Sequence, residues 1–232
     1  MIKPCAELVD SSYIERAKKL GVALLCDGAK AAKLDMVNCG CMEASIMPVD
    51  RGMTMVGTAM TVETANGDNF PIHVASYSAP CEGYVMVIDG KAYPHKAYFG
   101  DLIMGACQAV GFAGMVVDGY TRDRDGNIEL GFPVYSKGFM PNGPIKKDEG
   151  NINTPIVCGG VPVCPGDLVV GDSDGVCVVP RAYIETVLHE AEVKLAYEDK
   201  RNETIAKYKE AKKSGTALPQ LAPQWVIDMM NK

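Results

Sequence analysis

Two short apolar segments with a helical segment between them constrain the fold of this chain most. Residues 83–90 (GYVMVIDG) and 114–119 (GMVVDG) are of strand length and apolar up to a final Asp-Gly, a pattern typical of strands buried on both faces. Residues 98–111 (YFGDLIMGACQAVG) favour a helix that begins near Gly100 and Asp101 and stops at Gly111. Because parallel strands need a crossover and the crossover is right-handed, the sequence predicts a parallel β-α-β unit.

The flanking segments extend this unit into a larger α/β arrangement. Alternating runs of β-branched residues separated by Gly and Pro follow residue 154, which predicts antiparallel strands that meander. We further expect two short helices within 11–33, a strand over 53–63, a short helix over 70–79, a strand over 132–138 and one long charged helix from about 183 to 213. The chain is therefore expected to form a single domain over 1–232, with 183–232 as a C-terminal helical extension.

Composition excludes several classes of protein and partner. A chain of 232 residues can bury a sizeable core, and no apolar run approaches the roughly 20 residues that span a bilayer. A formal net charge of −6 argues against a nucleic-acid partner, which favours a basic face. Residues 1–21 lack the apolar stretch of a secretory signal. We expect a cytoplasmic protein that binds neither membrane nor nucleic acid.

The nine cysteines are odd in number and several lie within apolar runs, which indicates free thiols in a reducing compartment. Cys107, Cys158, Cys164 and Cys177 lie within apolar runs and are expected to be small buried side chains. The segment Cys39-Gly40-Cys41 comes nearest to a metal motif, but no second Cys or His pair follows at a suitable spacing. Neither a disulfide framework nor a structural zinc site is expected.

Familiar catalytic motifs are missing from the sequence. It has three histidines (His73, His95 and His189) and no serine in a G-x-S-x-G context, which argues against Ser-His-Asp catalysis. It has neither a G-x-x-x-x-G-K-[ST] nor a G-x-G-x-x-G nucleotide fingerprint. Kinase, dehydrogenase and methyltransferase functions are therefore disfavoured.

Asp101 and the pair Arg122-Asp123 are the strongest candidates for a functional site. One opens the helix after the first buried strand, and the others follow the second buried strand. Both places open at the carboxyl edge of a parallel sheet, where open α/β folds bind ligands. The three residues are thus expected to share one cleft.

The chemistry of these residues suits a small carboxylate substrate and a metal ion. The helix that starts at Asp101 is expected to offer free N–H groups at Leu102, Ile103 and Met104, which can seat a carboxylate. Arg122 can meet an anion with two parallel hydrogen bonds, and the carboxylates of Asp101 and Asp123 suit Mg²⁺ or Mn²⁺. On pattern alone, however, Asp101 could equally be a helix N-cap and Arg122-Asp123 an exposed salt-bridged turn.

Longer motifs make the chain resemble a known family. Asp101 followed after twenty residues by Arg122-Asp123 resembles the D-x20-R-D signature of the class II 4-hydroxy-4-methyl-2-oxoglutarate/4-carboxy-4-hydroxy-2-oxoadipate aldolases, which share a fold with the RraA regulators of ribonuclease E. Residues 57–69 (GTAMTVETANGDN), 131–138 (GFPVYSKG) and 159–181 (GGVPVCPGDLVVGDSDGVCVVPR) are also similar to that family. The resemblance covers about residues 11 to 215.

The resemblance implies a fold, an assembly and a site. The fold would be an α/β/β/α sandwich of the RraA-like, swivelling β/β/α type with a long C-terminal helix, assembled as a homotrimer or hexamer with active sites between subunits. In the implied site, Asp123 would bind the metal directly and Asp101 would bind it through water, while Glu198 of the neighbouring subunit would reach the metal's water shell. Arg122 would hold the 2-oxo oxygen, and Asn69 would line the pocket. The amides of Leu102, Ile103 and Met104 would bind the pyruvyl carboxylate.

The implied activity is a retro-aldol cleavage. The substrate would be a 4-hydroxy-2-oxo acid that releases pyruvate, and the same charge stabilisation would support decarboxylation of oxaloacetate. A non-catalytic regulator that binds ribonuclease E is the alternative, and a menaquinone-precursor methyltransferase is disfavoured because no adenosylmethionine loop is present. Residues 124–129 and 214–230 depart from the family pattern, which leaves the natural substrate open.

Overall fold

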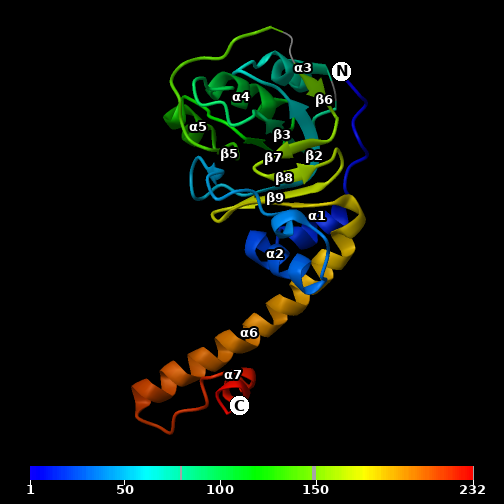
Figure 1. Cartoon of the computed structure of the whole chain (residues 1–232). Helices are drawn as coiled ribbons and strands as arrows, with labels where there is room; N and C mark the ends of the chain where they lie inside the picture. Colours follow the sequence, from blue (N-terminus) through cyan, green and yellow to red (C-terminus); the bar gives the residue numbers. More distant parts are fainter. Residues whose placement is uncertain (79, 148–149, 232) are drawn as a thin grey trace. The chain divides into compact units, whose positions relative to one another are not determined.

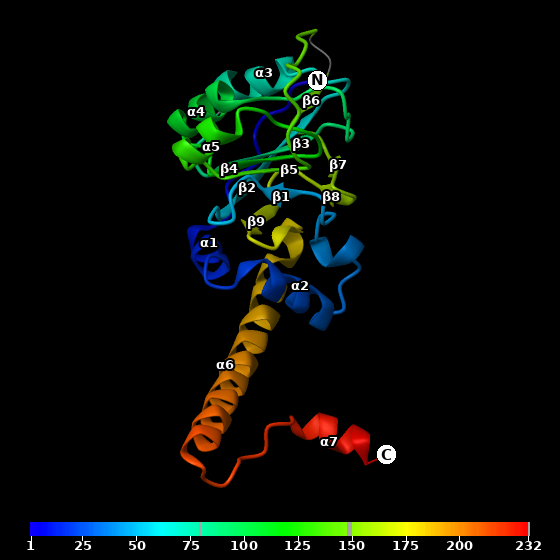
Figure 2. The ribbon, with the colours of Figure 1, turned by 90° about the vertical axis from the view of Figure 1, so that its left-hand side faces the viewer.

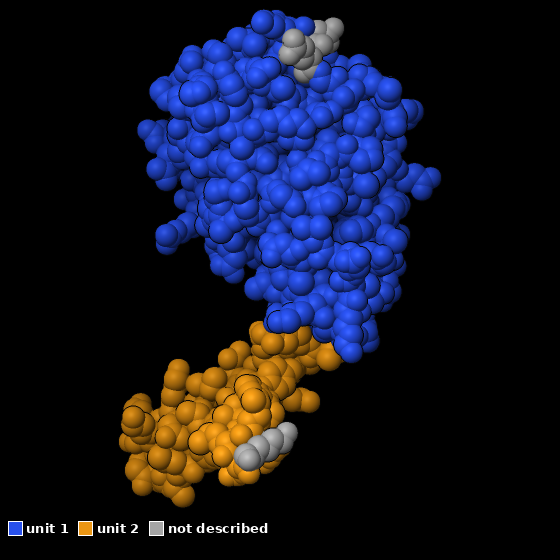
Figure 3. All heavy atoms as spheres, in the orientation of Figure 1, with its two compact units in different colours: residues 1–191 blue, residues 192–232 orange. Residues whose placement is uncertain are grey.

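The computed structural model describes residues 1–78, 80–147 and 150–231, and it divides into two compact units. Unit 1 comprises Met1–Ala191 and unit 2 comprises Glu192–Lys232 (Figure 3). Helix α6 (Ile184–Ser214) begins in unit 1, where Ile184, Val187, Leu188 and Ala191 are buried, and continues through unit 2. The expectation of a single domain with a helical extension stays a prediction.

An eight-stranded sheet forms the centre of unit 1. Its order is β1-β5-β4-β3-β2-β9-β10, and β6 pairs with β2 off this path. Strands β2, β3, β4 and β5 are mutually parallel, which confirms the predicted parallel β-α-β unit, whereas β1, β6, β9 and β10 pair antiparallel with their neighbours. The bounds are β1 Met47–Pro48, β2 Met55–Glu63, β3 Tyr84–Asp89, β4 Gly114–Val117, β5 Val134–Ser136, β6 Asn151–Ile152, β9 Leu168–Asp172 and β10 Gly175–Val179.

Three helices cover one face of the parallel strands (Figure 1). They are α3 (Phe70–Ser78), α4 (Asp101–Ala109) and α5 (Arg124–Leu130); residue 79, which the sequence assigned to the first of them, lies outside the described residues. Met86 and Ile88 of β3 pack with Met104 and Cys107 of α4 in the core between helices and sheet. Burial of such side chains stabilises the fold by roughly 1.5–3 kcal/mol each.

A second β layer covers the opposite face of the parallel strands (Figure 2). It consists of the separate hairpin β7 (Ile156–Cys158) and β8 (Val161–Val163) and of β9 and β10, which are the end of the same eight-stranded sheet. Side chains of these four strands pack with those of the parallel strands in a valine-rich core. Helices α1 (Ser11–Ala17) and α2 (Gly21–Ala31) lie beyond it, with α2 against β9 and β10. The edge strands β1 and β10 contact each other, so the sheet is nearly closed. This is the expected α/β/β/α arrangement with a long C-terminal helix.

Several elements of the structure were not anticipated from the sequence. Helix α5 follows Asp123, where the polar residues 124–129 show no apolar face, and it ends at Gly131 with φ of 63°. Helix α7 (Gln224–Met230) lies in the Pro-containing C-terminal segment, within the predicted helical extension but beyond the one long helix that was predicted there. Cys164 is exposed, contrary to the expectation that it is buried, because the alternating strand β8 ends at Val163 and the chain turns there.

Unit 2 consists of the remainder of α6 and the short helix α7. Arg201 of α6 donates a hydrogen bond from Nη2 to the carbonyl of Leu221 at 3.0 Å. Trp225, Met229 and Met230 of α7 are exposed. Across the described parts of both units, no helix combines the length and apolar character needed to cross a membrane.

Candidate active site

A short backbone ladder brings the ends of two strand connections together. Ala97 forms a parallel bridge with Tyr120, and the amide of Tyr98 donates to the carbonyl of Tyr120 at 2.8 Å. The Arg122 amide then donates to the carbonyl of Phe99 at 3.1 Å. These bonds hold the start of α4 beside the residues that follow β4.

The residues at this junction line one cavity of about 320 Å³. Asp101, Arg122 and Asp123 all face it, as the spacing in the sequence predicted. The other lining residues are Asn69, His73, Phe99, Gly100, Leu102, Ile103, Gly143, Pro144 and Lys146. Six of the eight residues proposed from the sequence are therefore brought together.

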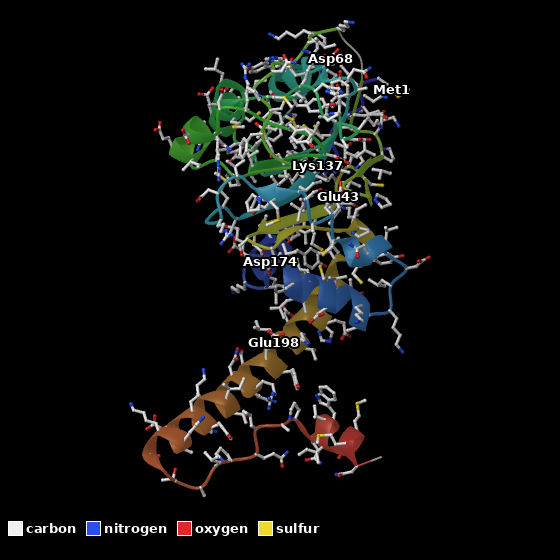
Figure 4. All side chains as sticks on the ribbon, turned by 60° about the vertical axis from the view of Figure 1, so that its left-hand side comes forward. Met1, Glu43, Asp68, Lys137, Asp174 and Glu198 are labelled. Atoms are coloured by element: carbon white, nitrogen blue, oxygen red, sulfur yellow. The ribbon has the colours of Figure 1, made fainter. Side chains whose placement is uncertain are left out.

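The remaining two proposed residues do not line the cavity. The Met104 side chain is fully buried in the core beneath α4. Glu198 lies on α6 in unit 2 (Figure 4), so its role at a site formed by residues of unit 1 stays a prediction.

At the N-terminus of α4, the amides without a hydrogen bond are only in part the ones that the sequence predicted. Gly100 is the N-cap, and its carbonyl accepts from the amides of Ile103 and Met104, both at 3.1 Å. The expectation of free N–H groups at these two residues is therefore wrong, because the first helical bonds already close on Gly100. The available amides are those that precede them, including that of Leu102, whose side chain is 85% exposed beside the cavity.

Three glycines make room for the three charged side chains. A Cβ on Gly100 would overlap Asp123 Oδ2, and one on Gly126 would lie 2.8 Å from Asp101 Oδ2. A Cβ on Gly143 would lie 2.8 Å from Arg122 Nη1. Gly126 belongs to the segment that departs from the family pattern, so that segment supports the site directly.

Two polar atoms at this cavity lack a hydrogen-bond partner within the described structure. They are Asn69 Oδ1, on a residue that is only 2% exposed, and Arg122 Nε. Arg122 Nε lies 3.3 Å from Asp123 Oδ2 as an ion pair, without hydrogen-bond geometry. Because buried polar atoms are nearly always satisfied, an unpaired acceptor and an unpaired donor in one cavity indicate a place for a polar ligand.

The loop that carries Asn69 is fixed by backbone hydrogen bonds. Asp68 Oδ1 accepts from the amide of Phe70 at 2.9 Å, and its Oδ2 accepts from the amide of Lys147 at 2.9 Å. The Asn69 amide donates to the carbonyl of Ile145 at 3.1 Å. The backbone that carries the unpaired Asn69 Oδ1 is therefore fixed independently of any ligand.

His73 and Lys146 also line the cavity and were not proposed from the sequence. Burial, and then the nearby Lys146, lower the pKa of His73 below its usual 6.5, so the imidazole is neutral near pH 7. The one signal in the sequence for His73 is its position four residues after Asn69, because residues four apart lie on the same side of a helical turn. His95 is exposed and does not line the cavity.

The donor set fits a divalent cation that keeps most of its water. No group of three or more His, Cys, Asp or Glu side chains in the described residues is arranged to hold a metal ion alone. Asp101 and Asp123 nevertheless present two carboxylates to one cavity, each seated against a glycine, with the unpaired Asn69 Oδ1 at the same cavity. Mg²⁺ is typically bound by one or two carboxylates plus water and substrate.

Comparison with known proteins identifies the family. The family model RraA-like (Aldolase/RraA) matches residues 22–178. A Halalkalibacterium halodurans protein, named "Putative 4-hydroxy-4-methyl-2-oxoglutarate aldolase", is 42% identical over 165 residues, which cover 71% of this chain and 78% of that protein. The chain therefore belongs to the RraA-like family.

Solved structures support the same fold under different names. Streptomyces coelicolor RraAS2, described as an unusual member of the RNase ES inhibitor RraA family, matches with a TM-score of 0.72 at 24% identity, over 84% of this chain and 97% of that one. A Geobacillus kaustophilus protein named S-adenosylmethionine:2-dimethylmenaquinone methyltransferase matches with a TM-score of 0.55 at 29% identity, over 60% of this chain and 86% of that one. The diversity of names within one fold means that function must be argued from the site.

Proposed function

We propose that this protein is a divalent-metal-dependent lyase that cleaves a 4-hydroxy-2-oxo acid to release pyruvate. The substrates would be 4-hydroxy-4-methyl-2-oxoglutarate or 4-carboxy-4-hydroxy-2-oxoadipate, with decarboxylation of oxaloacetate as a second activity. One observation carries the proposal: Asn69, Asp101, Arg122 and Asp123 line a single cavity that holds an unpaired buried donor and an unpaired buried acceptor.

Arg122 has the central role in the proposed chemistry. Breaking the C3–C4 bond leaves its electron pair on the pyruvyl fragment as an enolate, and charge develops on the 2-oxo oxygen. The Arg122 guanidinium, which lies close to Gly143 and whose Nε has no hydrogen-bond acceptor among the described residues, would donate to that oxygen. Such a donor lowers the barrier most when it is already oriented before the charge forms.

The carboxylates and the amide would position the remaining groups. Asp123 directly, and Asp101 through water, would hold Mg²⁺ or Mn²⁺, and the bound cation supplies further stabilisation of the developing negative charge. The Leu102 amide at the α4 N-terminus would bind the pyruvyl carboxylate. Asn69 Oδ1, which can only accept, would take a proton donor of the substrate or a bound water.

The proposal extends to an assembly of three or six copies. Leu102 is 85% exposed beside the cavity, and in such an assembly a neighbouring subunit would cover it. In that assembly Glu198 of an adjacent copy would complete the water shell of the cation. Sedimentation of the purified full chain tests the number of copies, and a monomer at micromolar concentration would contradict this part of the proposal.

The decisive experiment is pyruvate release from a panel of 2-oxo acids. Purified protein with Mg²⁺ or Mn²⁺ is expected to release pyruvate from at least one 4-hydroxy-2-oxo acid and to lose this activity with a chelator. Restoring the cation should restore the rate. Chelator-resistant turnover would remove the metal from the proposal, and failure to turn over any member of the panel would reject the lyase assignment.

A non-catalytic regulator of ribonuclease E is the second candidate. It is supported by the likeness of the fold to RraAS2 over 84% of this chain. This function predicts a stable complex with the ribonuclease and no metal-dependent turnover. A pull-down with purified ribonuclease E, run beside the pyruvate assay, separates the two candidates.

A further inference from the structure

Three cysteines from separate elements meet away from the cavity. Cys26 belongs to α2, Cys41 follows the 3-10 helix η1 (Val37–Gly40), and Cys177 belongs to β10. The Sγ atoms of Cys26 and Cys41 lie 2.6 Å apart, and the Sγ of Cys177 donates to the carbonyl of Cys39 at 3.8 Å. We refer to Cys26, Cys41 and Cys177 as the thiol cluster.

The backbone around Cys41 is held in one conformation. Asn38 and Cys39 adopt left-handed conformations with φ of 48° and 53°, and Asn38 Nδ2 donates to the carbonyl of Cys41 at 2.8 Å. Cys41 also forms an antiparallel bridge with Cys177. A Cβ on Gly40 would overlap the carbonyl of Val178, so this turn packs closely against β10.

The cluster combines a reactive thiol with a thiol that can pair with it. Hydrogen bonds from Cys177 and then from Cys26 lower the pKa of Cys41 below its usual 9.0, which favours the nucleophilic thiolate. Cys26 and Cys41 are both partly exposed, whereas Cys177 is buried. An oxidant can therefore reach Cys26 and Cys41 from solvent, whereas Cys177 is shielded from it.

The spacing of the sulfurs favours a disulfide over a metal site. Two thiolates on one tetrahedral zinc ion are separated by about 3.8 Å, given Zn–S bonds near 2.3 Å. The observed separation of 2.6 Å between Cys26 and Cys41 is much closer to the roughly 2.05 Å of a disulfide bond. The absence of a metal-type cluster among the described residues agrees with this.

We propose that Cys26 and Cys41 form a reversible disulfide when the protein meets a hydroperoxide. The Cys41 thiolate attacks the terminal peroxide oxygen, the O–O bond breaks, and the sulfur becomes a sulfenic acid. The other oxygen leaves as alkoxide or hydroxide and takes up a proton from solvent to become an alcohol or water. Cys26 then attacks that sulfur and displaces hydroxide, which takes up a proton to form water. With hydrogen peroxide, two thiols and one peroxide give one disulfide and two waters.

The disulfide would tie α2 to the segment that follows η1. The two cysteines are 15 positions apart, so the bridge would close a short loop and restrict the unfolded chain. None of the three cysteines lines the candidate active-site cavity. Success or failure of this proposal is therefore independent of the proposed lyase activity.

The test uses the full-length reduced protein and stoichiometric hydrogen peroxide. Two of the nine thiols are expected to be lost, and peptide mapping without reductant should show one cross-linked product that joins the peptides of Cys26 and Cys41. Dithiothreitol should reverse it. The oxidised protein should melt roughly 5–10 °C higher than the reduced protein.

Substitutions distinguish this pair from the other cysteines. Cys26→Ser should abolish the cross-link and leave a sulfenic acid at Cys41 that dimedone traps, with Cys26→Ala as a second variant if the serine protein does not fold. Cys164→Ser, which alters an exposed cysteine outside the cluster, should form the same cross-link as the wild type. A bridge between other cysteines, no bridge at all, or tight binding of Zn²⁺ alone that Cys26→Ser abolishes would overturn the proposal.

Discussion

Two ion pairs formed by residues that follow β4 and β5 have similar chemistry and different surroundings. Arg122 Nε lies 3.3 Å from Asp123 Oδ2, with side chains 40% and 39% exposed. Lys137 Nζ lies 3.2 Å from Asp118 Oδ1, with side chains only 12% and 13% exposed. The first pair faces a cavity and the second is closed in, so a charged pair becomes a candidate for catalysis only where the fold leaves it room for a ligand.

The buried pair is surrounded by partners from several elements. Asp118 Oδ2 accepts from the amide of Gly159 at 3.0 Å in the turn between β7 and β8. Lys137 also pairs with Glu43, and Figure 4 shows these two side chains next to each other. This network joins the end of β4, the end of β5 and the β7–β8 turn. Its role is therefore structural.

Removing the exposed pair should produce the largest effect, and that effect should be on activity. Arg122→Ala is expected to lower kcat/KM for pyruvate release about 10³-fold, because a preoriented donor to the developing charge is lost. The free energy of unfolding should change by less than about 1 kcal/mol, since the pair is exposed. Steady-state kinetics and urea denaturation measure the two quantities.

A neighbouring arginine provides the control for this substitution. Arg124 lies over the ring of Phe139 and does not line the cavity. Arg124→Ala should retain activity within a few fold. An equal loss in both variants would mean that general disturbance of this loop, and not the Arg122 guanidinium, explains the result.

Breaking the buried pair should instead affect stability. Lys137→Met leaves the Asp118 carboxylate in a poorly solvated place without its cation, which is expected to lower the free energy of unfolding by about 3 kcal/mol. Activity per folded molecule should be retained. The matched control is Lys18→Met, which removes an exposed pair with Glu15 and should cost under about 1 kcal/mol. Comparable losses in both variants would contradict the distinction.

A single methyl group should disturb the exposed site with a smaller effect. Gly100→Ala places a Cβ against Asp123 Oδ2, and the displaced carboxylate is expected to reduce kcat/KM roughly 10- to 100-fold. Gly105→Ala on the same helix meets only Leu130 at an ordinary 3.7 Å. That control should retain activity, and an active Gly100→Ala enzyme would show that the Asp123 position is not critical.

The smallest expected effect is a pH dependence from Asp118. Burial raises the pKa of Asp118 above its usual 3.8, so the folded protein holds this proton more tightly than the unfolded chain. Its contribution to stability is present below pH 3.8 and is lost as the pH rises through the folded-state pKa. Asp118→Asn should lack this decline in thermal melts from pH 3.5 to 7; an unchanged profile would assign the titration to another group.

The sequence predicted much of the fold where the pattern is local. The apolar runs of β3 and β4 and the glycine limits of α4 were sufficient to predict a parallel unit, and the structure confirms it. Helix α5 was missed because its polar residues have no apolar periodicity and its start depends on Asp123 in a left-handed conformation, with φ of 57°. Asp123 also lies close to Gly100 at the start of α4, a contact between distant segments that a local pattern does not contain.

The candidate site was also predicted only in part. Asp101, Arg122 and Asp123 were found because they flank strong elements, whereas His73 and the supporting role of Gly126 were not. The thiol cluster could not be predicted, because Cys177 meets Cys41 across a large separation in sequence. Spacing rules identify ligands that are close in the chain and miss those that a sheet brings together.

The sequence by itself therefore determined which chemical groups share the carboxyl edge of the sheet. The reason is that parallel strands joined by a helix place their ends on one side, whatever packs around them. The tertiary structure alone decided which charged pair faces a cavity, which amides of α4 remain free and which cysteines touch. Those properties depend on burial and on contacts between distant segments, which form only when both faces of the sheet are covered.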